Sequence, residues 1–237
     1  MQSAFDTLVS DTNATLERIA ADFSPAVFAS SLAAEDMVLT DLILRAALPI
    51  QIFTLETGRL HAETLGMLDR IKETYGYTVT PFKPETAAVD SYVAQHGLNA
   101  FYDSVAMRKE CCRIRKVEPL NRALAGNKAW VTGQRRAQST TRNELAVQED
   151  DAAHNMSKFN PLADWSEEDV WHYIRSHGVP YNPLHDKGFP SIGCEPCTRA
   201  IEPGEDVRAG RWWWENPDSK ECGLHVVDGK LIRIKPA

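Results

Sequence analysis

The feature that most constrains the fold of this chain is the alternation of short apolar segments with longer segments of helical pattern. Four short segments have the length and composition of buried strands, namely residues 26–29, 50–54, 77–81 and 128–132. Helical patterns cover residues 5–23, 37–47, 60–75 and 85–96. Strands that alternate with helices of this length form βαβ units, so we predict an α/β fold with a parallel sheet.

A further helix is predicted to begin at residue 166. Ser166 is a suitable N-cap because Asp169 follows three positions later, and Gly178 ends the helical pattern. Beyond it the chain is rich in Pro and Gly and has no clear period. We therefore expect an α/β domain over residues 1–180 and a loop-rich C-terminal segment over residues 181–237.

Three loops follow predicted strands, at residues 30–36, 55–59 and 133–136. Ligands of parallel sheets bind beyond the carboxyl ends of the strands, so these loops are expected to share one cleft. The loop at 30–36 is rich in small residues and precedes a helix, an arrangement that can present backbone N–H groups to a phosphate. A simple connecting loop explains the same residues equally well, and the Gly-Lys-Ser/Thr of a Walker loop is missing.

Size and composition are those of a globular protein. With 237 residues, of which 43% are hydrophobic, the chain can bury a full core. It has no apolar stretch near the roughly 20 residues that span a bilayer. It also starts without a basic and then apolar leader, so a cytoplasmic protein is expected.

Positive charge is concentrated in one part of an acidic chain. The net charge of −7 argues against general nucleic-acid binding. Residues 108–142, however, contain ten Lys or Arg against two acidic residues. Such a run is commonly a solvated face. Its position between a cysteine pair and the turn at 133–136 favours a compact anionic ligand.

The five cysteines divide into two tight pairs and one lone residue. Cys111 adjoins Cys112, two residues separate Cys194 from Cys197, and Cys222 stands alone. Reduced thiols in the cytoplasm favour metal or redox chemistry over disulfides. Neighbouring residues on a helix point about 100° apart, which suits separate irons of a cluster better than one zinc ion. An iron–sulfur cluster is the favoured interpretation, while a zinc clip or ordinary buried cysteines stay open.

Cys222 has candidate activating neighbours. A thiolate is the nucleophilic form of cysteine, and nearby cations lower the pKa of a thiol; the candidates here are Arg208, Arg211 and His225. The alternative is an incidental cysteine. The three tryptophans at 212–214 could dock this tail, although core packing is the simpler interpretation.

Five motifs stand out along the chain: Ser30-Ser31-Leu32-Ala33-Ala34-Glu35-Asp36, Leu55-Glu56-Thr57-Gly58-Arg59, Cys111-Cys112-Arg113-Ile114-Arg115-Lys116, Val131-Thr132-Gly133-Gln134-Arg135-Arg136 and Glu221-Cys222-Gly223-Leu224-His225. Together they resemble the assimilatory adenylyl-sulfate reductases, part of the wider family that also reduces phosphoadenylyl sulfate. The resemblance runs over nearly the whole chain. Its most specific parts are the two cysteine pairs and the Glu-Cys-Gly-Leu-His ending.

The resemblance implies reduction of adenylyl sulfate to sulfite and AMP, with thioredoxin or a glutaredoxin-like protein as donor, in sulfate assimilation and cysteine biosynthesis. It implies a parallel-sheet adenine-nucleotide α-hydrolase-like (PP-loop) fold with a loop-rich C-terminal tail. It also implies one 4Fe–4S cluster per chain. Relatives tend to be homo-oligomers, so a dimer or tetramer is expected, with no nucleic-acid or membrane partner.

The same resemblance implies roles for individual residues. The cluster would be bound by Cys111, Cys112, Cys194 and Cys197, with Lys116 between it and the substrate sulfate. The phosphate and sulfate region would be held by Ser30, Ser31 and Leu32, and the adenosine by Leu55, Thr57 and Gly58. The anionic groups would be bound by Arg135, Arg136, Arg208, Arg211 and His225. Cys222, on a mobile tail, would attack the sulfur, release AMP and carry the sulfonate until a donor thiol expels sulfite.

One residue departs from the family pattern, and three other functions stay open. Many relatives have Gly where this chain has Ala33, and a Cβ restricts close approach of that loop. The first alternative is a phosphoadenylyl-sulfate or dual-specificity reductase, against which the two cysteine pairs weigh. The second is a PP-loop ATP pyrophosphatase or tRNA-modifying enzyme, whose Ser-Gly-Gly-x-Asp-Ser type loop is absent. The third is a zinc-clipped binding module with an inert Cys222.

Overall fold

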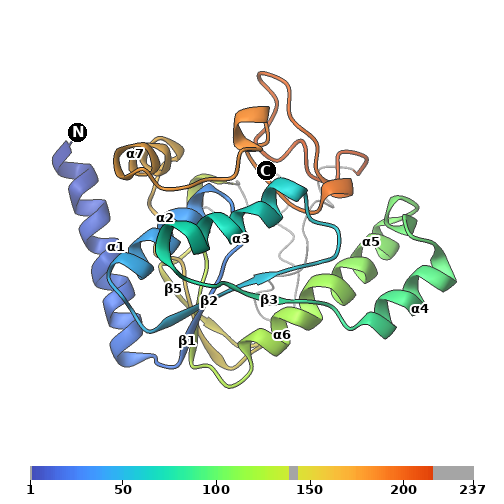
Figure 1. Ribbon diagram of the computed structural model, residues 1–237, viewed down its shortest axis with the longest axis horizontal. Helices are drawn as coiled ribbons and strands as arrows, with labels where there is room; N and C mark the ends of the chain where they lie inside the picture. Colours follow the sequence, from blue (N-terminus) through green and yellow to red (C-terminus); the bar gives the residue numbers. More distant parts are fainter. Residues whose placement is uncertain (1, 139–143, 216–237) are drawn as a thin grey trace.

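In the computed structural model, which describes residues 2–138 and 144–215, a six-stranded sheet forms the centre of the molecule (Figure 1). Its strands are β1 (Ala26–Ala29), β2 (Ile50–Leu55), β3 (Thr80–Phe82), β4 (Ala129–Val131), β5 (Gln148–Asp151) and β6 (Met156–Phe159). They lie in the order β3-β2-β1-β4-β6-β5. The predicted parallel sheet is confirmed, but two of its strands were not predicted: β6 pairs parallel with β4, and the edge strand β5 pairs antiparallel with β6.

Helices cover both faces of this sheet. They are α1 (Gln2–Asp22), α2 (Ala34–Arg45), α3 (Ala62–Tyr75), α4 (Thr86–His96), α5 (Val105–Cys112), α6 (Glu118–Leu124) and α7 (Glu167–His177). One core joins α1, α2, α3 and α7 to strand residues such as Phe28 and Ile52. A second core joins α6 to Val27, Phe53 and Trp130. The neighbouring residues Val27 and Phe28 thus enter different cores, as in a strand buried on both faces.

The helix predicted from residue 166 is confirmed together with its caps. The side chain of Ser166 accepts a hydrogen bond from the Asp169 N–H, and the Asp169 carboxylate accepts one from the Ser166 N–H, which completes a capping box. Gly178 ends the helix in the left-handed conformation. Because the signals at both ends are local, α7 was readable from the sequence.

The third predicted strand, at residues 77–81, is wrong in its position. The structure has β3 at Thr80–Phe82 instead. The hydroxyl of Tyr77 accepts a hydrogen bond from the Ile52 N–H at 2.9 Å, and pairing of β2 with β3 begins only at Phe53 and Thr80. The Ile52 N–H of β2 is therefore already bonded to the Tyr77 side chain. It is not available to pair with a strand that begins at residue 77.

The C-terminal segment from residue 181 to 215 has little regular structure, as expected. It contains two short turns, His185–Lys187 and Glu195–Cys197, and an isolated bridge joins Cys194 to Leu60 just before α3. Figure 1 shows this segment, in orange, near the N-terminal end of α3. None of the described helices is long and apolar enough to cross a membrane.

Candidate active site at the carboxyl edge of the sheet

A cavity of about 780 Å³ lies where the loops after β1, β2 and β4 meet the C-terminal segment. This volume is in the range of about 300–1,000 Å³ that is usual for small-molecule sites. Eight of the predicted substrate-binding residues line it: Ser30, Ser31, Leu55, Thr57, Lys116, Arg135, Arg208 and Arg211. Three others within the described ranges do not, namely Leu32, Gly58 and Arg136. Cys222 and His225 lie outside the described residues.

The loop after β1 is shaped by its own side chains. The N–H and the hydroxyl of Ser31 donate to the Asp36 carboxylate at 2.6 and 2.5 Å, and the Leu32 N–H donates to Ser30 Oγ at 3.2 Å. Leu32 has a φ of 65° and its side chain is fully buried. A branched-chain residue in this left-handed region is strained, which is common where a loop must hold a functional conformation. Leu32 therefore shapes the loop from the core side and does not reach the cavity.

The helix that follows this loop begins three residues earlier than predicted. Ala33 is the N-cap of α2 with a φ of −85°, a conformation that tolerates a Cβ, so the residue that departs from the family pattern fits here without strain. The next N–H, of Ala34, donates to Nε2 of His185 at 3.1 Å. Burial lowers the pKa of His185, consistent with a neutral ring that accepts this hydrogen bond.

Two carboxylates beside the loop have different roles. Burial raises the pKa of Asp36 to about 6, although the hydrogen bonds from Ser31 oppose the shift. Glu35 instead faces Arg135, whose Nε and Nη2 donate to its Oε1 at 3.0 and 2.8 Å. Arg135 also donates to the Trp165 carbonyl at 3.3 Å. An anion at Arg135 would therefore share its guanidinium with Glu35.

Arg136 points to a different environment from its neighbour. Its Nε donates to the Leu145 carbonyl at 2.7 Å, and its guanidinium forms an ion pair with Asp164. Its predicted role as an anion ligand is not supported by this position, because its two polar contacts lie away from the cavity wall. The sequence could not separate Arg135 from Arg136, since both follow the same strand.

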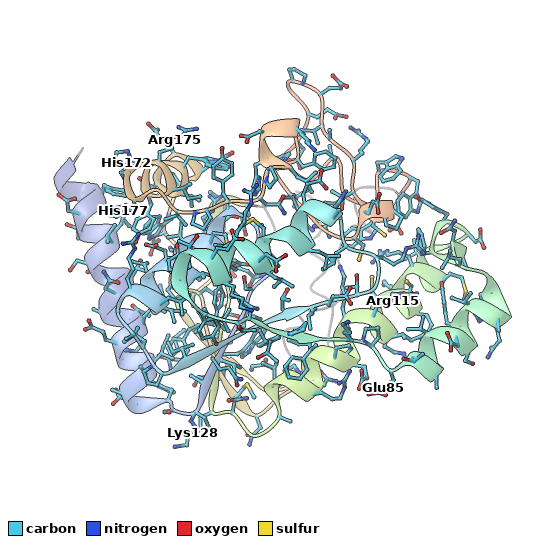
Figure 2. The ribbon with its side chains drawn as sticks, in the orientation of Figure 1. Glu85, Arg115, Lys128, His172, Arg175 and His177 are labelled. Carbon is cyan, nitrogen blue, oxygen red and sulfur yellow. The ribbon has the colours of Figure 1, made fainter. Side chains whose placement is uncertain are left out.

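The loop after β2 connects the cavity to the cysteines. The Thr57 hydroxyl lies 3.3 Å from the sulfur of Cys194, and the Thr57 carbonyl accepts from Nη1 of Arg115 at 2.7 Å. The Gly58 N–H donates to Glu56 Oε1 at 2.7 Å. Figure 2 shows Arg115 near α5 and α6, on the side of the molecule away from α7.

The four paired cysteines lie in one neighbourhood. Cys111 and Cys112 end α5, and Cys194 and Cys197 flank the turn at Glu195–Cys197. Burial raises the pKa of Cys197 to about 12, and Cys194, Cys112 and Cys111 raise it further. Burial also raises the pKa of Cys111. Among the residues that the structure describes, no three His, Cys, Asp or Glu side chains are arranged to hold a single metal ion.

Three cationic residues line the cavity together with Cys194, one of these thiols. Lys116 belongs to a π-helical turn, Arg113–Val117, lines the cavity, and opposes the rise in pKa of Cys111 and Cys197. Such turns are often found at functional sites. Arg208 and Arg211 line the cavity from the C-terminal segment. The cavity therefore has a cationic wall on its cysteine side, which suits an anionic ligand.

A third group of lining residues was not predicted from the sequence. It comes from α7 and the loop after it, and consists of Glu167, Trp171, Arg175, Tyr181, His185 and Asp186. Figure 2 shows Arg175 on α7, at the upper edge of the molecule. The helical pattern of α7 predicts a core-facing stripe and gives no sign that the face with Glu167, Trp171 and Arg175 lines a cavity. The only local signal was a His and an Asp within a Pro- and Gly-rich loop.

Comparisons with known proteins agree with this architecture. The protein-family model for the phosphoadenosine phosphosulfate reductase domain matches residues 25–200 of this chain. Adenosine 5'-phosphosulfate reductase of Burkholderia cepacia is 65% identical over 215 residues, 91% of this chain and 86% of the relative. The protein of that name from Allochromatium vinosum is 60% identical over 210 residues, 89% of this chain and 82% of the relative.

Solved structures show the same fold at low sequence identity. The phosphoadenylyl-sulfate (PAPS) reductase of Candida auris, in a phosphate complex, is 24% identical with a TM-score of 0.69, covering 85% of this chain and 98% of that one. The FMN adenylyltransferase of Candida glabrata is 14% identical with a TM-score of 0.59, covering 95% of this chain and 80% of that one. The predicted PP-loop type of α/β fold is confirmed by these neighbours.

Proposed function

The chain belongs to the phosphoadenosine phosphosulfate reductase family, and on that premise we propose that it reduces adenylyl sulfate to sulfite and AMP in sulfate assimilation and cysteine biosynthesis. The observation that carries the proposal is the single cavity that the strand-end loops share with the cationic residues beside the two cysteine pairs. On one side of the cavity the loop after β1 can bind a phosphate, and on the other side the cationic residues can bind a sulfate. We place the reaction in the cytoplasm, where thiols stay reduced.

The cysteine pairs fit a 4Fe–4S cluster. Four thiols from two distant segments meet in one buried neighbourhood, and the vicinal Cys111 and Cys112 end a helix, where they point in different directions. The ligands would be those two residues together with Cys194 and Cys197. When bound, the cluster would supply positive charge against four thiolates and link the two segments.

The first chemical step is assigned to Cys222. Its thiolate gives an electron pair to the sulfur of adenylyl sulfate, the S–O bond to phosphate breaks, and that electron pair leaves with AMP. Both reactants are anionic, so Lys116, Arg208 and Arg211 on the cavity wall would offset their repulsion. The product is a thiosulfonate on Cys222, and His225 would assist from the same tail.

The second step requires a thiol donor. A donor thiolate attacks the sulfur of Cys222, the bond to the sulfonate breaks, and sulfite leaves with the electron pair. A second donor thiol then resolves the mixed disulfide, so two donor thiols become a disulfide while the substrate sulfur gains two electrons. Thioredoxin or a glutaredoxin-like protein fits this requirement. We expect the working protein to be a dimer or tetramer.

The nucleotide would be bound at the strand-end loops. We assign Ser30 and Ser31 to the phosphate region and Leu55 and Thr57 to the adenosine, and the position of all four on the cavity wall supports this assignment. Arg135 would contribute once an anion competes with Glu35 for its guanidinium. A phosphoadenylyl-sulfate reductase is the alternative, and the match to the phosphoadenosine phosphosulfate reductase domain gives it a specific basis.

Steady-state sulfite release tests the proposal. The iron-loaded protein is supplied with reduced thioredoxin and either adenylyl sulfate or its 3'-phosphorylated form. We expect kcat/KM to be at least about tenfold higher with adenylyl sulfate, because an added phosphate needs cations of its own. A preference for the phosphorylated nucleotide would favour the alternative. Sulfite from neither nucleotide would refute both.

A further inference from the structure

A buried ion pair joins α5 to the last described residue of the chain. Nε and Nη2 of Arg108 donate to Oε1 and Oε2 of Glu215, each at 2.8 Å. The side chain of Arg108 is fully buried and that of Glu215 is 4% exposed. The two residues are 107 positions apart in sequence. A bidentate contact of this kind fixes orientation as well as distance.

Trp212 connects this ion pair to the second cysteine pair. The guanidinium of Arg108 lies 4.6 Å from the centre of the Trp212 ring, and the guanidinium of Arg211 lies 4.8 Å from it. The backbone N–H of Trp212 donates to the carbonyl of Cys197 at 3.0 Å, and the backbone N–H of Glu215 donates to the carbonyl of Trp212 at 2.8 Å. The turn at 212–215 is therefore closed and tied to the loop that carries Cys197.

The backbone of this turn is held in an uncommon conformation. Trp212 has a φ of 41° and is 1% exposed. A bulky residue in that region is rare and persists only where the surroundings determine it. Stacking between two guanidinium groups and the hydrogen bond to Cys197 supply those surroundings. These contacts therefore fix the position of Glu215 relative to α5 and to the loop that carries Cys197.

The cost of burial indicates that the ion pair serves position more than stability. Removing two charges from water carries a large free-energy cost, and apolar residues of similar size often replace such pairs without loss of stability. Arg108 precedes Cys111 by three residues on α5, and Glu215 precedes Cys222 by seven. Seven residues span at most about 25 Å, so the place of Glu215 limits where Cys222 can reach.

We propose that the Arg108–Glu215 ion pair, stacked on Trp212, is a positioning device that fixes, beside the cysteine-bearing helix, the point at which the Cys222 segment begins. The proposal rests on the proposed function, in which Cys222 attacks the substrate. Within the described residues, Trp212 and Arg211 line the cavity, whereas Arg108 and Glu215 do not. Loosening the pair should therefore slow delivery of the thiol without weakening nucleotide binding.

The experiment follows sulfonation of Cys222 in a single turnover. Iron-loaded wild-type protein and Glu215→Gln are mixed with saturating adenylyl sulfate without reductant, and intact mass is recorded over time. We expect the variant to reach the same final adduct at a rate at least about tenfold lower, because the amide loses the charge that holds the guanidinium. Iron content and AMP affinity should stay within about twofold of wild type.

A matched control is available in the same segment. Arg199 and Glu205 also form a bidentate pair, with Nη2–Oε1 and Nη1–Oε2 distances of 2.7 and 2.8 Å, but both side chains are about one third exposed. Glu205→Gln should leave the sulfonation rate within about twofold of wild type, as exposed pairs contribute little. An equal effect of both variants would mean a general loosening of the segment and would overturn the proposal.

A double variant distinguishes positioning from simple structural damage. If the pair acts as a unit, Arg108→Gln with Glu215→Gln should be about as slow as the slower single variant, because the losses do not multiply. An unchanged rate in Glu215→Gln, or a parallel loss of iron and AMP binding, overturns the proposal. An adduct missing from wild-type protein would instead refute the proposed function, and the positioning role with it.

Discussion

The loop after β1 and the cysteine-bearing segments face the same cavity, yet the contacts that hold them join residues at very different separations along the chain. The loop after β1 is fixed by Ser31 and Asp36, which are five residues apart. On the cysteine side, Thr57 meets Cys194 across 137 residues, and Arg108 meets Glu215 across 107. Local contacts form wherever the short segment forms, whereas distant contacts require the whole domain to be assembled. Substitutions on the two sides should therefore fail in different ways.

The largest expected effect is on the cysteine side. Cys194→Ala removes one of four proposed cluster ligands, so iron and sulfide content should fall sharply and turnover should drop by at least about 100-fold, since metal binding and local folding are coupled. AMP affinity should change by less than about threefold, because the loop after β1 keeps its local contacts and Thr57 loses only its contact with the Cys194 sulfur. Iron analysis and calorimetric titration with AMP measure the two sides separately.

Cys222→Ser is the control for that variant. It removes the proposed nucleophile and leaves the four paired cysteines intact, so iron content should equal that of wild type while turnover is lost. Full iron content in Cys194→Ala would contradict the assignment of the ligands. Loss of AMP binding in Cys194→Ala would show that the two sides of the cavity are not independent.

The second prediction concerns a substitution that should disturb only the strand-end loops. A Cβ on Gly133 would overlap with Oδ1 of Asp36, and Asp36 is fixed by Ser31. Gly133→Ala should lower the free energy of unfolding by about 1–3 kcal/mol, as other overpacked sites do, and should raise the KM for the nucleotide. Iron content should not change. Urea unfolding and steady-state kinetics provide the two readouts.

Gly66 offers a comparison within α3. A Cβ there meets nothing within 4 Å, so Gly66→Ala should raise the free energy of unfolding by about 0.5–1 kcal/mol. If both glycine variants were neutral, the close contact between Gly133 and Asp36 would have no mechanical importance, and the loop would be more adaptable than its hydrogen bonds indicate.

The third prediction uses pH to isolate Asp36. Its pKa is about 6 in the folded protein against an ordinary value of 3.8. The native state thus binds this proton more tightly than the unfolded state does, so the stabilisation is fully present below pH 3.8 and is lost as pH rises through about 6. Between pH 3.8 and pH 6, the free energy of unfolding of wild type should fall by roughly 3 kcal/mol relative to that of Asp36→Asn. This figure follows from about 1.36 kcal/mol per unit of pKa difference between the folded and unfolded states.

Urea unfolding of both proteins between pH 4 and pH 7 checks this difference. Subtracting the Asp36→Asn curve cancels the titration of other groups, provided that their surroundings are unchanged. If the free energies of unfolding of the two proteins changed with pH in parallel, Asp36 would have its ordinary pKa in the folded protein. The loop would then hold the ionised carboxylate without a measurable loss of stability.

The smallest effect is expected at Ala33. Its φ of −85° suits alanine and glycine alike, and the better capping by glycine is offset by the greater entropy of its unfolded state. Ala33→Gly should therefore change the free energy of unfolding by less than about 0.5 kcal/mol and KM by less than about twofold. A tenfold fall in KM, measured by the same sulfite assay, would show that the Cβ does obstruct the substrate.

The same division between local and distant contacts explains what the sequence could predict. β1 lies at the predicted residues because four consecutive apolar residues mark it, and the cap of α7 is encoded by Ser166 and Asp169 alone. By contrast, β5 has the sequence Gln-Glu-Asp-Asp, with alternating exposed and half-buried positions. An edge strand of this composition has no apolar pattern, so its antiparallel pairing with β6 could not be recognised.

The site shows the same limits. The two cysteine pairs and the three strand-end loops are visible as short motifs, and the structure brings the loops and Cys194 to one cavity, with the other paired cysteines close to Cys194. The partners of Arg108 and Arg135 could not be inferred, because Glu215 and Glu35 lie about a hundred residues away and many other acids are equally distant in sequence. Pairings of this kind follow from the fold and not from the local pattern.

The central claim is that the cavity delivers a nucleotide-bound sulfate to the thiol of Cys222. The most direct measurement is the intact mass of the iron-loaded protein after anaerobic incubation with adenylyl sulfate and no reductant. The account predicts a gain of one sulfonate, absent in Cys222→Ser and removed with release of sulfite when reduced thioredoxin is added. No gain in mass on protein that carries iron and sulfide, or a gain that persists in Cys222→Ser, would contradict it.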